Sequence, residues 1–335
     1  MEKEYKKARE FLEKITPKNK VAIITHDDLD GICSGIILHD FVEFKTKSLE
    51  IFFFSYNKGK DDFDLSKFDT VIISDLAPNL LQELFRKIED KKVLYIDHHP
   101  KNEKVPENFL EIRSPSWSSC SRITFEICGS QKNKWVSLCG VIGDAGDKFA
   151  ENKEFLDSFL KKEDVSLDDF RYKYAYRFGN MLVYLDENPR KSFDLLRSLE
   201  SYKEISKVEK YILPVDKEIE KTLEEYKKKM EKLGDITFFV FEPKYGIKSV
   251  IINIISFSAS KEDIFAFLTQ FEDEYRISFR AQSRKTNGPK LLKDCGVENA
   301  GGHNAACGGS IKKGFLKQFK ENLKNYDIKK ARVLD

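Results

Sequence analysis

The sequence predicts an α/β protein whose first domain is built on a parallel sheet and whose second, smaller domain is also α/β. Short apolar runs rich in β-branched and aromatic residues predict four strands, at residues 21–25, 51–54, 71–74 and 93–96. Longer segments with helical spacing separate them. Continuous apolar strands that alternate with helices are typical of a parallel sheet buried on both faces. The length of 335 residues favours two domains over one.

Helices are expected between these strands and through the middle of the chain. Apolar residues recur three or four positions apart in residues 32–41 and 80–88, and residues 151–211 are mostly helical in pattern. A longer helix is expected to begin at Pro214, because proline suits the first turn, and to end before Gly234, which can cap it. Its polar face and its length of about 20 residues indicate a connector packed on one side. It has too few heptads to favour a coiled coil.

The pattern changes to strands after this helix. Strands are expected at residues 236–241, 247–255 and 275–280, with a helix near 261–271. This succession indicates a second α/β domain.

Composition restricts the classes of function. Charged residues make up 34% of the chain, yet the formal net charge is only +2. That balance excludes a protein that wraps nucleic acid through overall basicity, although a local basic groove remains open. The six cysteines form no C-x-x-C pair, which favours reduced thiols in the cytosol. The charged N-terminal segment lacks the apolar core of a signal peptide, and no run approaches about 18 apolar residues. A cytoplasmic protein with no membrane partner is expected.

Acidic and imidazole side chains gather at the ends of the apolar runs. They lie in residues 25–31, 74–76, 96–100 and 140–144, which hold three of the five histidines. Ligands of parallel sheets bind beyond the carboxyl ends of the strands, so these side chains are expected to meet. Taken alone, each of these segments is more simply explained as a helix N-cap or as ordinary protein surface. Four such segments in one domain instead predict a site for divalent metal ions.

The spacing of the acidic residues is compatible with a pair of metal ions. Asp28 and Asp30 are two residues apart, so in extended backbone both would face one cluster. Asp75, Asp97 and His98 follow other strands and could converge there. Two ions about 3.5–4 Å apart need a bridging carboxylate and several further ligands, and they activate water for attack at phosphorus. Mixed carboxylate and imidazole ligands suit Mn²⁺, with Mg²⁺ or Co²⁺ as alternatives.

These motifs carry a resemblance to a known family. The D-x-D motif, Asp75, and the D-H-H sequence at residues 97–99 resemble the DHH phosphoesterase superfamily. Residues 301–309, which begin Gly-Gly-His, resemble the GGGH motif of the DHHA1 domain that accompanies it. The whole pattern is similar to archaeal RecJ-like single-strand exonucleases, and it also fits compact DHH/DHHA1 proteins that degrade very short oligonucleotides.

The resemblance implies a bilobal α/β architecture. Residues 1–185 would form the parallel-sheet DHH phosphoesterase domain, and residues 186–234 a helical connector. Residues 235–335 would form the smaller, DHHA1-like domain that binds substrate.

The resemblance also implies roles for individual residues. Asp97 and His99 would be catalytic, with His99 in contact with the scissile phosphate, and Asp75 would bridge the metal ions. The expected metal ligands are His26, Asp28, Asp30, Asp75, His98 and Asp144. The expected substrate-binding residues are Gly301, Gly302, His303, Arg280, Ser283 and Arg284.

Several positions leave alternatives open. His26 stands two residues before Asp28, where bacterial members have four, so Asp27 is a second candidate ligand. Ala300 stands where the first glycine of GGGH would be. The polar residues at 280–284 could contact phosphate or simply be solvated.

The serines between the third and fourth motifs also have two readings. Ser116, Ser118, Ser119 and Ser121, with Arg122, could contact substrate. One of the serines is expected instead to cap the helix that follows.

The expected reaction is hydrolysis of single-stranded DNA or RNA from an end, by attack of hydroxide held by two metal ions, with release of nucleotides. Single-stranded nucleic acid or a short oligonucleotide would be the substrate, and a replication or repair protein a further partner. The alternative activities are a nano-oligonucleotide or cyclic-dinucleotide phosphodiesterase and a phosphoadenosine phosphatase. The alternative of another class is a non-catalytic replication or repair scaffold, which should have lost the metal carboxylates that this chain keeps.

Overall fold

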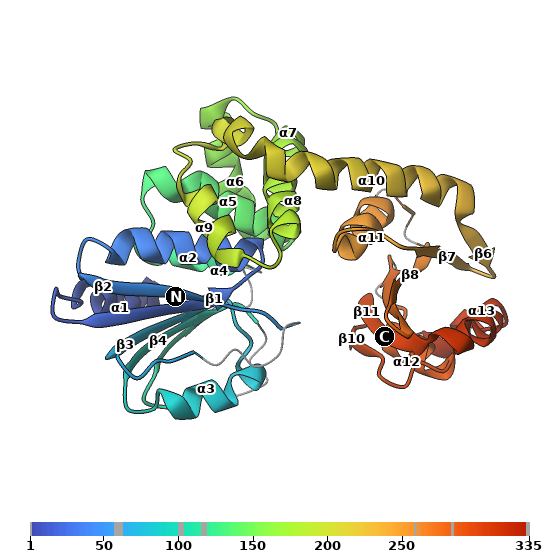
Figure 1. Ribbon diagram of the computed structural model, residues 1–335, viewed down its shortest axis with the longest axis horizontal. Coiled ribbons are helices and arrows are strands. Elements are labelled where there is room, and N and C mark those ends of the chain that lie inside the picture. The colour runs from blue at the N-terminus through green and yellow to red at the C-terminus, as the bar shows by residue number, and fades with distance from the viewer. Residues whose placement is uncertain are drawn as a thin grey trace. The chain divides into compact units, whose positions relative to one another are not determined.

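The computed structural model divides into two compact units, Met1–Ile212 and Leu213–Asp335 (Figure 1). The division falls inside residues 186–234, where the sequence predicts a connector. In the described part of the chain, no helix is both long and apolar enough to cross a membrane. The structure describes residues 2–56, 63–99, 104–114, 119–257, 259–260, 262–282 and 285–332.

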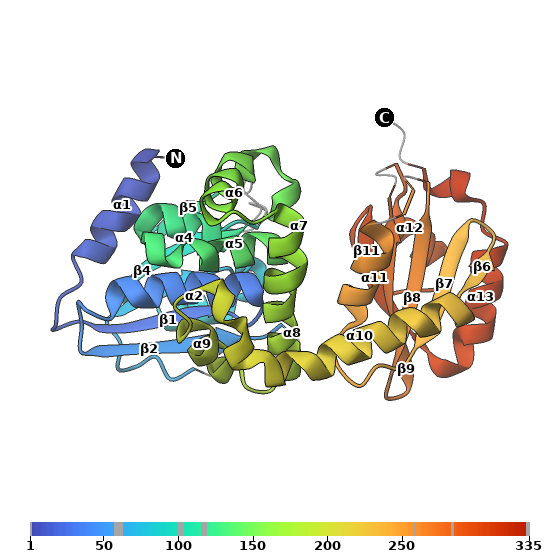
Figure 2. The same ribbon diagram turned by 90° about the horizontal axis from the view of Figure 1, so that it is seen from above.

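A five-stranded parallel sheet forms the centre of the first unit, as predicted (Figure 2). The strands have the order β2-β1-β3-β4-β5, and every neighbouring pair is parallel. The carboxyl ends of β1, β3 and β4 are therefore neighbours at one edge of the sheet. The short strand β5 is not apparent in the sequence pattern. The bounds are β1 (Lys20–His26), β2 (Ser48–Phe54), β3 (Thr70–Ser74), β4 (Lys92–Asp97) and β5 (Leu110–Arg113).

Helices cover both faces of this sheet, so alternate strand residues enter two separate cores. Ile23 and Ile72 belong to the larger core, which contains residues of α2, α4 and α5. Ile24 and Ile73 point into the smaller core on the other face, with Phe85 of α3. This double burial explains why the strands are continuous apolar runs. The helices are α1 (Glu2–Glu13), α2 (Leu29–Val42), α3 (Gln82–Lys87), α4 (Cys120–Cys128), α5 (Lys134–Gly143), α6 (Ala150–Glu163), α7 (Leu167–Phe170), α8 (Tyr176–Tyr184) and α9 (Pro189–Arg197).

The long helix of the predicted connector begins and ends earlier than expected. α10 spans Glu209–Lys229, so Pro214 lies inside it and not in its first turn. A 3₁₀ segment, Tyr202–Val208, leads directly into α10, so the helix begins before Pro214, which removes one helical hydrogen bond in the second turn. Gly234 does not cap the helix. It lies between β6 and β7, where its φ of 59° forms a left-handed turn that glycine adopts without strain.

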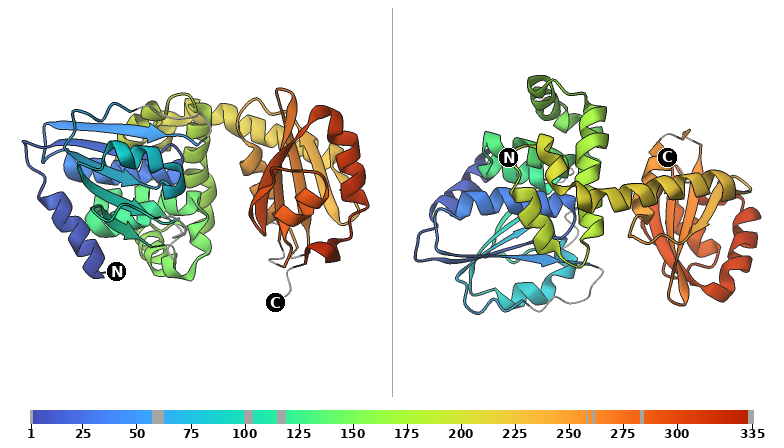
Figure 3. Two further views of the ribbon diagram at one scale, coloured as in Figure 1. Left: turned by 90° about the horizontal axis from the view of Figure 1, so that it is seen from below. Right: turned by 45° about the horizontal axis from the view of Figure 1, so that its top comes forward.

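A six-stranded mixed sheet forms the second unit (Figure 3). The strand order is β10-β11-β9-β8-β7-β6, with only β7 and β8 parallel among the named pairs. Helices α12 and α13 pack on one face, where Phe279 and Phe319 share a core. On the other face, α11 packs against β8 and β9. The bounds are β6 (Glu231–Leu233), β7 (Ile236–Phe241), β8 (Ile264–Phe271), β9 (Glu274–Ala281), β10 (Gly301–His303), β11 (Ala306–Lys312), α11 (Lys248–Phe257), α12 (Gly288–Asp294) and α13 (Leu316–Lys324).

Two predicted elements of this unit are wrong. Residues 247–255, predicted as a strand, lie almost entirely in helix α11, and the segment 261–271, predicted as a helix, contains strand β8. The isoleucines of α11 favour strand by propensity, but Ile247 and Ile251 are four apart and both buried, which is helical spacing. In β8, residues on both faces are apolar because helices cover both sides, so no alternation is visible.

Candidate metal centre

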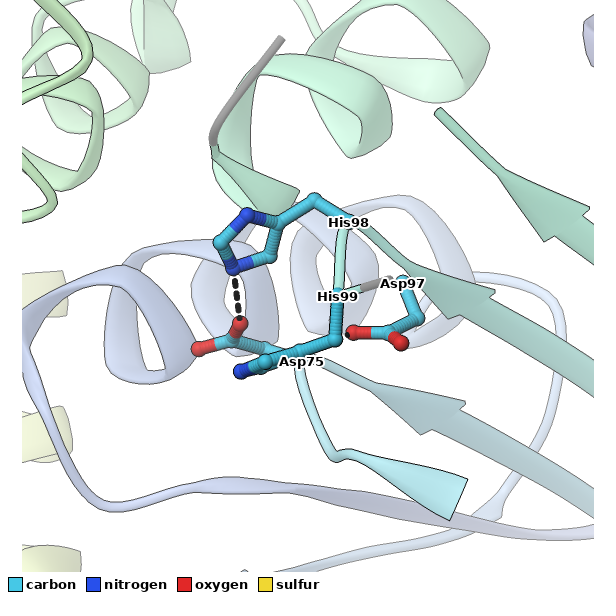
Figure 4. Close-up of side chains that lie close together, drawn as sticks. All are labelled: Asp75, Asp97, His98 and His99. Atoms are coloured by element: carbon cyan, nitrogen blue, oxygen red, sulfur yellow. Dashed lines mark hydrogen bonds and ion pairs between the residues drawn. The ribbon is translucent and has the colours of Figure 1, made fainter. Parts of the chain in front are cut away.

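The polar side chains that follow the strands meet at the carboxyl edge of the first sheet. β1 ends at His26, Asp75 directly follows β3, and β4 ends at Asp97, with His98 and His99 next in the chain. Figure 4 shows His98 directed toward Asp75, with Asp97 and His99 beside them. The strand order brings these three ends together from distant parts of the sequence.

Two helices add the remaining carboxylates. Asp28 is the N-cap of α2, and its Oδ1 accepts a hydrogen bond of 2.9 Å from the amide of Gly31. Asp30 lies in the first turn of that helix, so the expected extended backbone through both aspartates is wrong. The N-cap explains the difference, because capping by Asp28 starts the helix before Asp30 is reached. Asp144 is the C-cap residue of α5.

The six expected ligands fall into two groups around Asp75. His26, Asp28 and Asp75 offer ligand atoms within 4.8 Å of one another, and Asp30, His98 and Asp144 do the same. A third group consists of Asp75, Asp97, His98 and His99, so Asp97 and His99 are also close enough to share an ion. Oδ1 of Asp75 lies 3.1 Å from Nε2 of His98, and its Oδ2 lies 4.0 Å from Nδ1 of His26. The six expected metal ligands therefore gather around one buried carboxylate.

The electrostatics of this cluster favour a cation. Burial and the charges of neighbouring aspartates raise the pKa of Asp75 well above its usual value, and the same causes raise the pKa of Asp144. Among the described residues, Oδ2 of Asp75 is buried without a hydrogen-bond partner. Oxygen ligands that repel one another and a buried oxygen without a donor are what divalent ions neutralise. The residues present fit such ions.

The two histidines respond differently to this environment. Burial opposes protonation of His26. The negative charge of Asp28 and the hydrogen bond between the two residues outweigh this effect and raise the pKa of His26. Burial likewise opposes ionisation of Asp28, yet His26 lowers the pKa of Asp28 to about 2. Burial lowers the pKa of His98 in spite of the carboxylates around it. The neutral imidazole that this favours is the form that binds metals.

Asp27, the alternative ligand, also lies near His26. Its Oδ1 is 3.5 Å from Nε2 of His26, whereas Oδ2 of Asp28 is 2.9 Å from Nδ1. Asp27 is not a member of either group around Asp75.

Asp97 is held from two sides by neighbouring side chains. Its Oδ1 lies 2.7 Å from Nδ1 of His99. Its Oδ2 lies 3.0 Å from the hydroxyl of Tyr95 and 3.8 Å from Nε of Arg113. Burial opposes ionisation of Asp97, but the hydrogen bond and charge of His99 lower its pKa. This arrangement engages Nδ1 of His99, so Nε2 is the ring nitrogen that Asp97 does not contact.

The N-terminus of α4 holds Asp30 in place. Oδ2 of Asp30 accepts a hydrogen bond of 2.5 Å from the amide of Cys120. Its Oδ1 accepts bonds of 3.0 Å from the amide of Ser121 and 2.7 Å from the hydroxyl of Ser119. Ser119 is also the N-cap of α4, as expected for one of these serines, while Ser116 and Ser118 lie outside the described residues. Its bond to Asp30 spans 89 residues, and only the N-cap signal in the sequence points to Ser119.

Close packing at the centre depends on backbone features. Asp75 has a φ of 60°, a left-handed conformation that is strained for a residue with a side chain. A side chain on Gly140 of α5 would overlap Asp30 and Ser121. This glycine lets α5 approach the carboxylate.

A second cluster of similar composition is already neutralised. His39, Asp40 and Glu43 lie close enough to share a cation. However, Nε of Arg197 is 2.7 Å from Asp40, and its Nη2 is 2.5 Å from Glu43. The chain supplies its own cation there, in contrast to Asp75.

The expected substrate-binding residues belong to the second unit. Gly301, Gly302 and His303 form strand β10 and are exposed, and Arg280 is a partly buried residue of β9. Arg280 and His303 both pair with Ala306 of β11, from opposite sides. Ala300, in the first position of the glycine motif, is buried. Ser283 and Arg284 lie outside the described residues.

Comparison with known proteins agrees with the geometry of the first unit. Residues 20–144 match the sequence model of the DHH family, N-terminal domain. This range runs from the start of β1 to Asp144 and contains all six expected metal ligands. No curated protein matches the sequence.

Solved structures with a similar fold extend over almost the whole chain. Exonuclease RecJ bound to manganese has a TM-score of 0.72 at 14% identity, over 98% of this chain and 96% of that chain. A pGpG-specific phosphodiesterase from Vibrio cholerae has a TM-score of 0.56 at 15% identity, over 93% and 100%. CDC45 from Entamoeba histolytica has a TM-score of 0.57 at 10% identity, over 96% and 98%. The family match shows that residues 20–144 form a DHH-family N-terminal domain, and the similar structures show that the chain has a RecJ-like fold.

Proposed function

We propose that the protein is a metal-dependent phosphodiesterase that shortens single-stranded nucleic acid from an end. The observation that carries this proposal is the position of Asp75. One of its oxygens faces His98 and, among the described residues, the other lacks a hydrogen-bond partner, so Asp75 lies between donor groups that would hold two ions. The ligands would be His26, Asp28, Asp30, Asp75, His98 and Asp144. Their mixed chemistry favours Mn²⁺, with Mg²⁺ or Co²⁺ as alternatives.

Ions bound there would supply Lewis acidity toward water and toward a phosphate oxygen. The chain itself would supply His99. With Nδ1 engaged by Asp97, Nε2 is the nitrogen that can hold or donate a proton at a substrate oxygen. A third of the His99 side chain is exposed, whereas Asp97 is fully buried. Asp97 therefore acts by positioning and polarising His99, and His99 would contact the scissile phosphate.

The second unit would bind the substrate. We assign Arg280, Gly301, Gly302 and His303 to phosphate or sugar contacts, as in a DHHA1-like domain that follows a DHH domain and a connector. Backbone amides of glycines approach phosphate oxygens without side-chain obstruction, and a guanidinium can bind phosphate through two bonds. The similarity to exonuclease RecJ supports digestion of a nucleic acid from an end. The similarity to a pGpG-specific phosphodiesterase supports the alternative of a very short substrate.

Hydrolysis with Mn²⁺ tests this proposal. A single strand of about 20 nucleotides, labelled at the 5′ or the 3′ end, is compared with a dinucleotide, in DNA and RNA form. Stepwise shortening of the long strand is expected, and the label that is lost first gives the polarity. Cleavage of the dinucleotide alone would move the protein to the short-oligonucleotide class. No cleavage of any of these substrates would favour a scaffold role.

Asp75→Asn is the informative variant, because it removes the connecting charge and keeps the size of the side chain. Asp194→Asn is the matched control. Asp194 is exposed on α9 and pairs only with Arg190, and such surface pairs contribute little. Loss of activity in Asp75→Asn but not in Asp194→Asn is expected.

A further inference from the structure

One face of the second sheet carries a row of very small residues. Tyr226 of α10 packs over β7 and β8 on this face, and α11 packs against β8 and β9. Ser278 of β9, Gly308 of β11 and Gly301 of β10 lie directly opposite one another across three strands, and Ser278 is buried whereas Gly308 is partly exposed and Gly301 exposed. A Cβ added to Gly301 would meet no atom within 4 Å. Gly308 and Gly301 form a floor on which an extended ligand can lie close to the backbone.

Basic side chains surround this floor. Arg280 and His303 occupy the next row on the same face, on either side of Ala306. Arg276 lies on the other side of the floor, because residues four apart in a strand share a face. Lys248 is the first residue of α11, the helix that packs against β9. These four residues come from three elements, β9, β10 and α11, and no single sequence motif contains them.

Two of these cations have no carboxylate to neutralise them. Among the described residues, Lys248 makes no ion pair, and the side chain of Arg280 donates only to the carbonyl of Phe279, at 3.0 Å. Both side chains are partly buried. Burial, and then the charges of Arg276 and Arg280, lower the pKa of Lys248, and burial lowers the pKa of Arg280. Cations held close together and away from water are stabilised by an anion between them.

Arg276 is the least available of the group. Its Nε lies 3.5 Å from Glu274, and its guanidinium stacks on the ring of Phe271 at 3.4 Å. For comparison, Lys290 on α12 is fully paired, with its ammonium 2.6 Å from Asp294. The uncompensated positive charge is thus centred on Lys248 and Arg280, beside the floor.

We propose that Lys248, together with Arg280 and His303, holds successive phosphates of a single-stranded oligonucleotide laid across the floor of Gly308 and Gly301. This inference rests on the proposed function and names Lys248 as a determinant of substrate length. Arg280 and His303 are two strands apart, or about 10 Å between their backbones, and Lys248 approaches from a helix above the sheet. A chain of phosphates can contact basic side chains that lie this far apart, whereas a single phosphate cannot contact all of them.

Binding without hydrolysis tests the proposal. The full-length protein is titrated into a fluorescein-labelled 12-nucleotide single strand in excess EDTA, at several salt concentrations, and anisotropy is recorded. The logarithm of the binding constant is expected to fall with the logarithm of salt by about 0.7 per phosphate contact in single strands. Lys248→Gln should reduce this slope by about 0.7 and weaken binding about 5- to 10-fold. Lys248→Arg should restore both, and Lys290→Gln should change neither.

Competition by shorter ligands separates a chain of phosphates from a single one. Unlabelled strands of two, four and six nucleotides should compete progressively better for binding to the wild type. This improvement with length should be smaller for Lys248→Gln. A mononucleotide or inorganic phosphate that competes as well as the four-nucleotide strand would overturn the proposal. So would Lys248→Gln with an unchanged slope and affinity. Arg280→Gln is the second variant, which should lower the slope independently if Lys248→Gln does not fold.

Hydrolysis by the same preparations distinguishes this inference from the proposed function. Binding that depends on Lys248, without cleavage in Mn²⁺, would overturn the proposed activity and leave the binding site standing. Cleavage by the wild type, with equal binding by wild type and Lys248→Gln, would overturn the binding site alone.

Discussion

The Nε2 atom of His98 lies 3.1 Å from Oδ1 of Asp75. The other oxygen of Asp75 has no hydrogen-bond partner among the described residues, and its nearest basic neighbour is His26 at 4.0 Å. Asp75 is almost completely buried and its backbone is left-handed. A strained, buried carboxylate surrounded by other carboxylates reduces the stability of the metal-free protein, and the proposed metal ions would offset this cost.

Asp75→Asn should stabilise the protein without metal and abolish stabilisation by metal. The amide removes a buried charge that other aspartates repel, so the melting temperature in EDTA should rise by about 2–6 °C. Saturating Mn²⁺ should stabilise the wild type, by about 2.7 kcal/mol at 100 times the dissociation constant. Thermal unfolding of both proteins, with EDTA and with Mn²⁺, measures the two effects. An unchanged Mn²⁺ shift in the variant would exclude Asp75 as a ligand, and Asp194→Asn should behave as wild type.

Ser119→Ala should weaken metal binding, because Asp30 loses the hydroxyl that fixes its Oδ1. The variant also loses the N-cap of α4, which costs about 1 kcal/mol of stability. Ser166→Ala is the matched control, because Ser166 caps α7 in the same way without contact to a candidate ligand. Both variants should lose similar stability, and only Ser119→Ala should need several times more Mn²⁺ to reach its full thermal shift. Equal Mn²⁺ requirements in the two variants would mean that the hydroxyl does not orient Asp30.

The edge of the first sheet could be predicted because its signals are local. Each strand is a continuous apolar run, and Asp75 and Asp97 stand at the carboxyl ends, where a parallel sheet collects its polar residues. The sequence does not reveal that Asp30 lies in a helix, because Asp28 fits the first position of a D-x-D motif and a helix N-cap equally well. In the second unit, α11 and β8 are apolar on nearly every side, and their pattern does not separate helix from strand.

The supporting residues of the site could not be predicted, because their roles depend on contacts that the sequence does not encode locally. The amide of Cys120 reaches Asp30 across 90 residues. Arg113 reaches Asp97 only because β5, a strand of four residues, pairs with β4. Lys248 joins the basic residues of β9 through the packing of α11.

Tyr95→Phe should slow hydrolysis more than it affects metal binding. The hydroxyl of Tyr95 lies 2.5 Å from the carbonyl of Leu76 and 3.0 Å from Oδ2 of Asp97, so it holds the carboxylate that orients His99. Removing such a supporting hydrogen bond should lower kcat about 10-fold, with a smaller change in KM. The Mn²⁺-induced thermal shift should be retained. Tyr202→Phe is the control, since the hydroxyl of Tyr202 lies 3.4 Å from Glu163, which is not a candidate ligand.

A Mn²⁺ shift lost in Tyr95→Phe would contradict this assignment and make Asp97 a metal ligand. An unchanged kcat would show that His99 does not depend on Asp97 for its orientation.

Asp69 should make the stability of the first sheet depend on acid pH. Its carboxylate accepts hydrogen bonds from the amide of Lys20 at 2.8 Å, from Asn19 at 2.9 Å and from Thr70 at 2.6 Å, at the starts of β1 and β3. Partial burial opposes ionisation, but these bonds outweigh it and lower the pKa of Asp69. A pKa that is lower in the folded than in the unfolded state stabilises the fold above the unfolded value of about 3.9, and this contribution is lost as the pH falls through the folded value.

Asp69→Ala should therefore reduce the free energy of unfolding by about 1 kcal/mol at pH 7, and by less at pH 3.5. Urea unfolding of wild type and variant at pH 7, 5 and 3.5 measures the difference. Asp90→Ala is the control, because Asp90 is exposed and lies 3.9 Å from its partner Lys91, so the substitution should cost little at any pH. A gap between Asp69→Ala and wild type that widens on acidification would contradict the prediction, since protonation would then strengthen the contacts of Asp69 and not remove them.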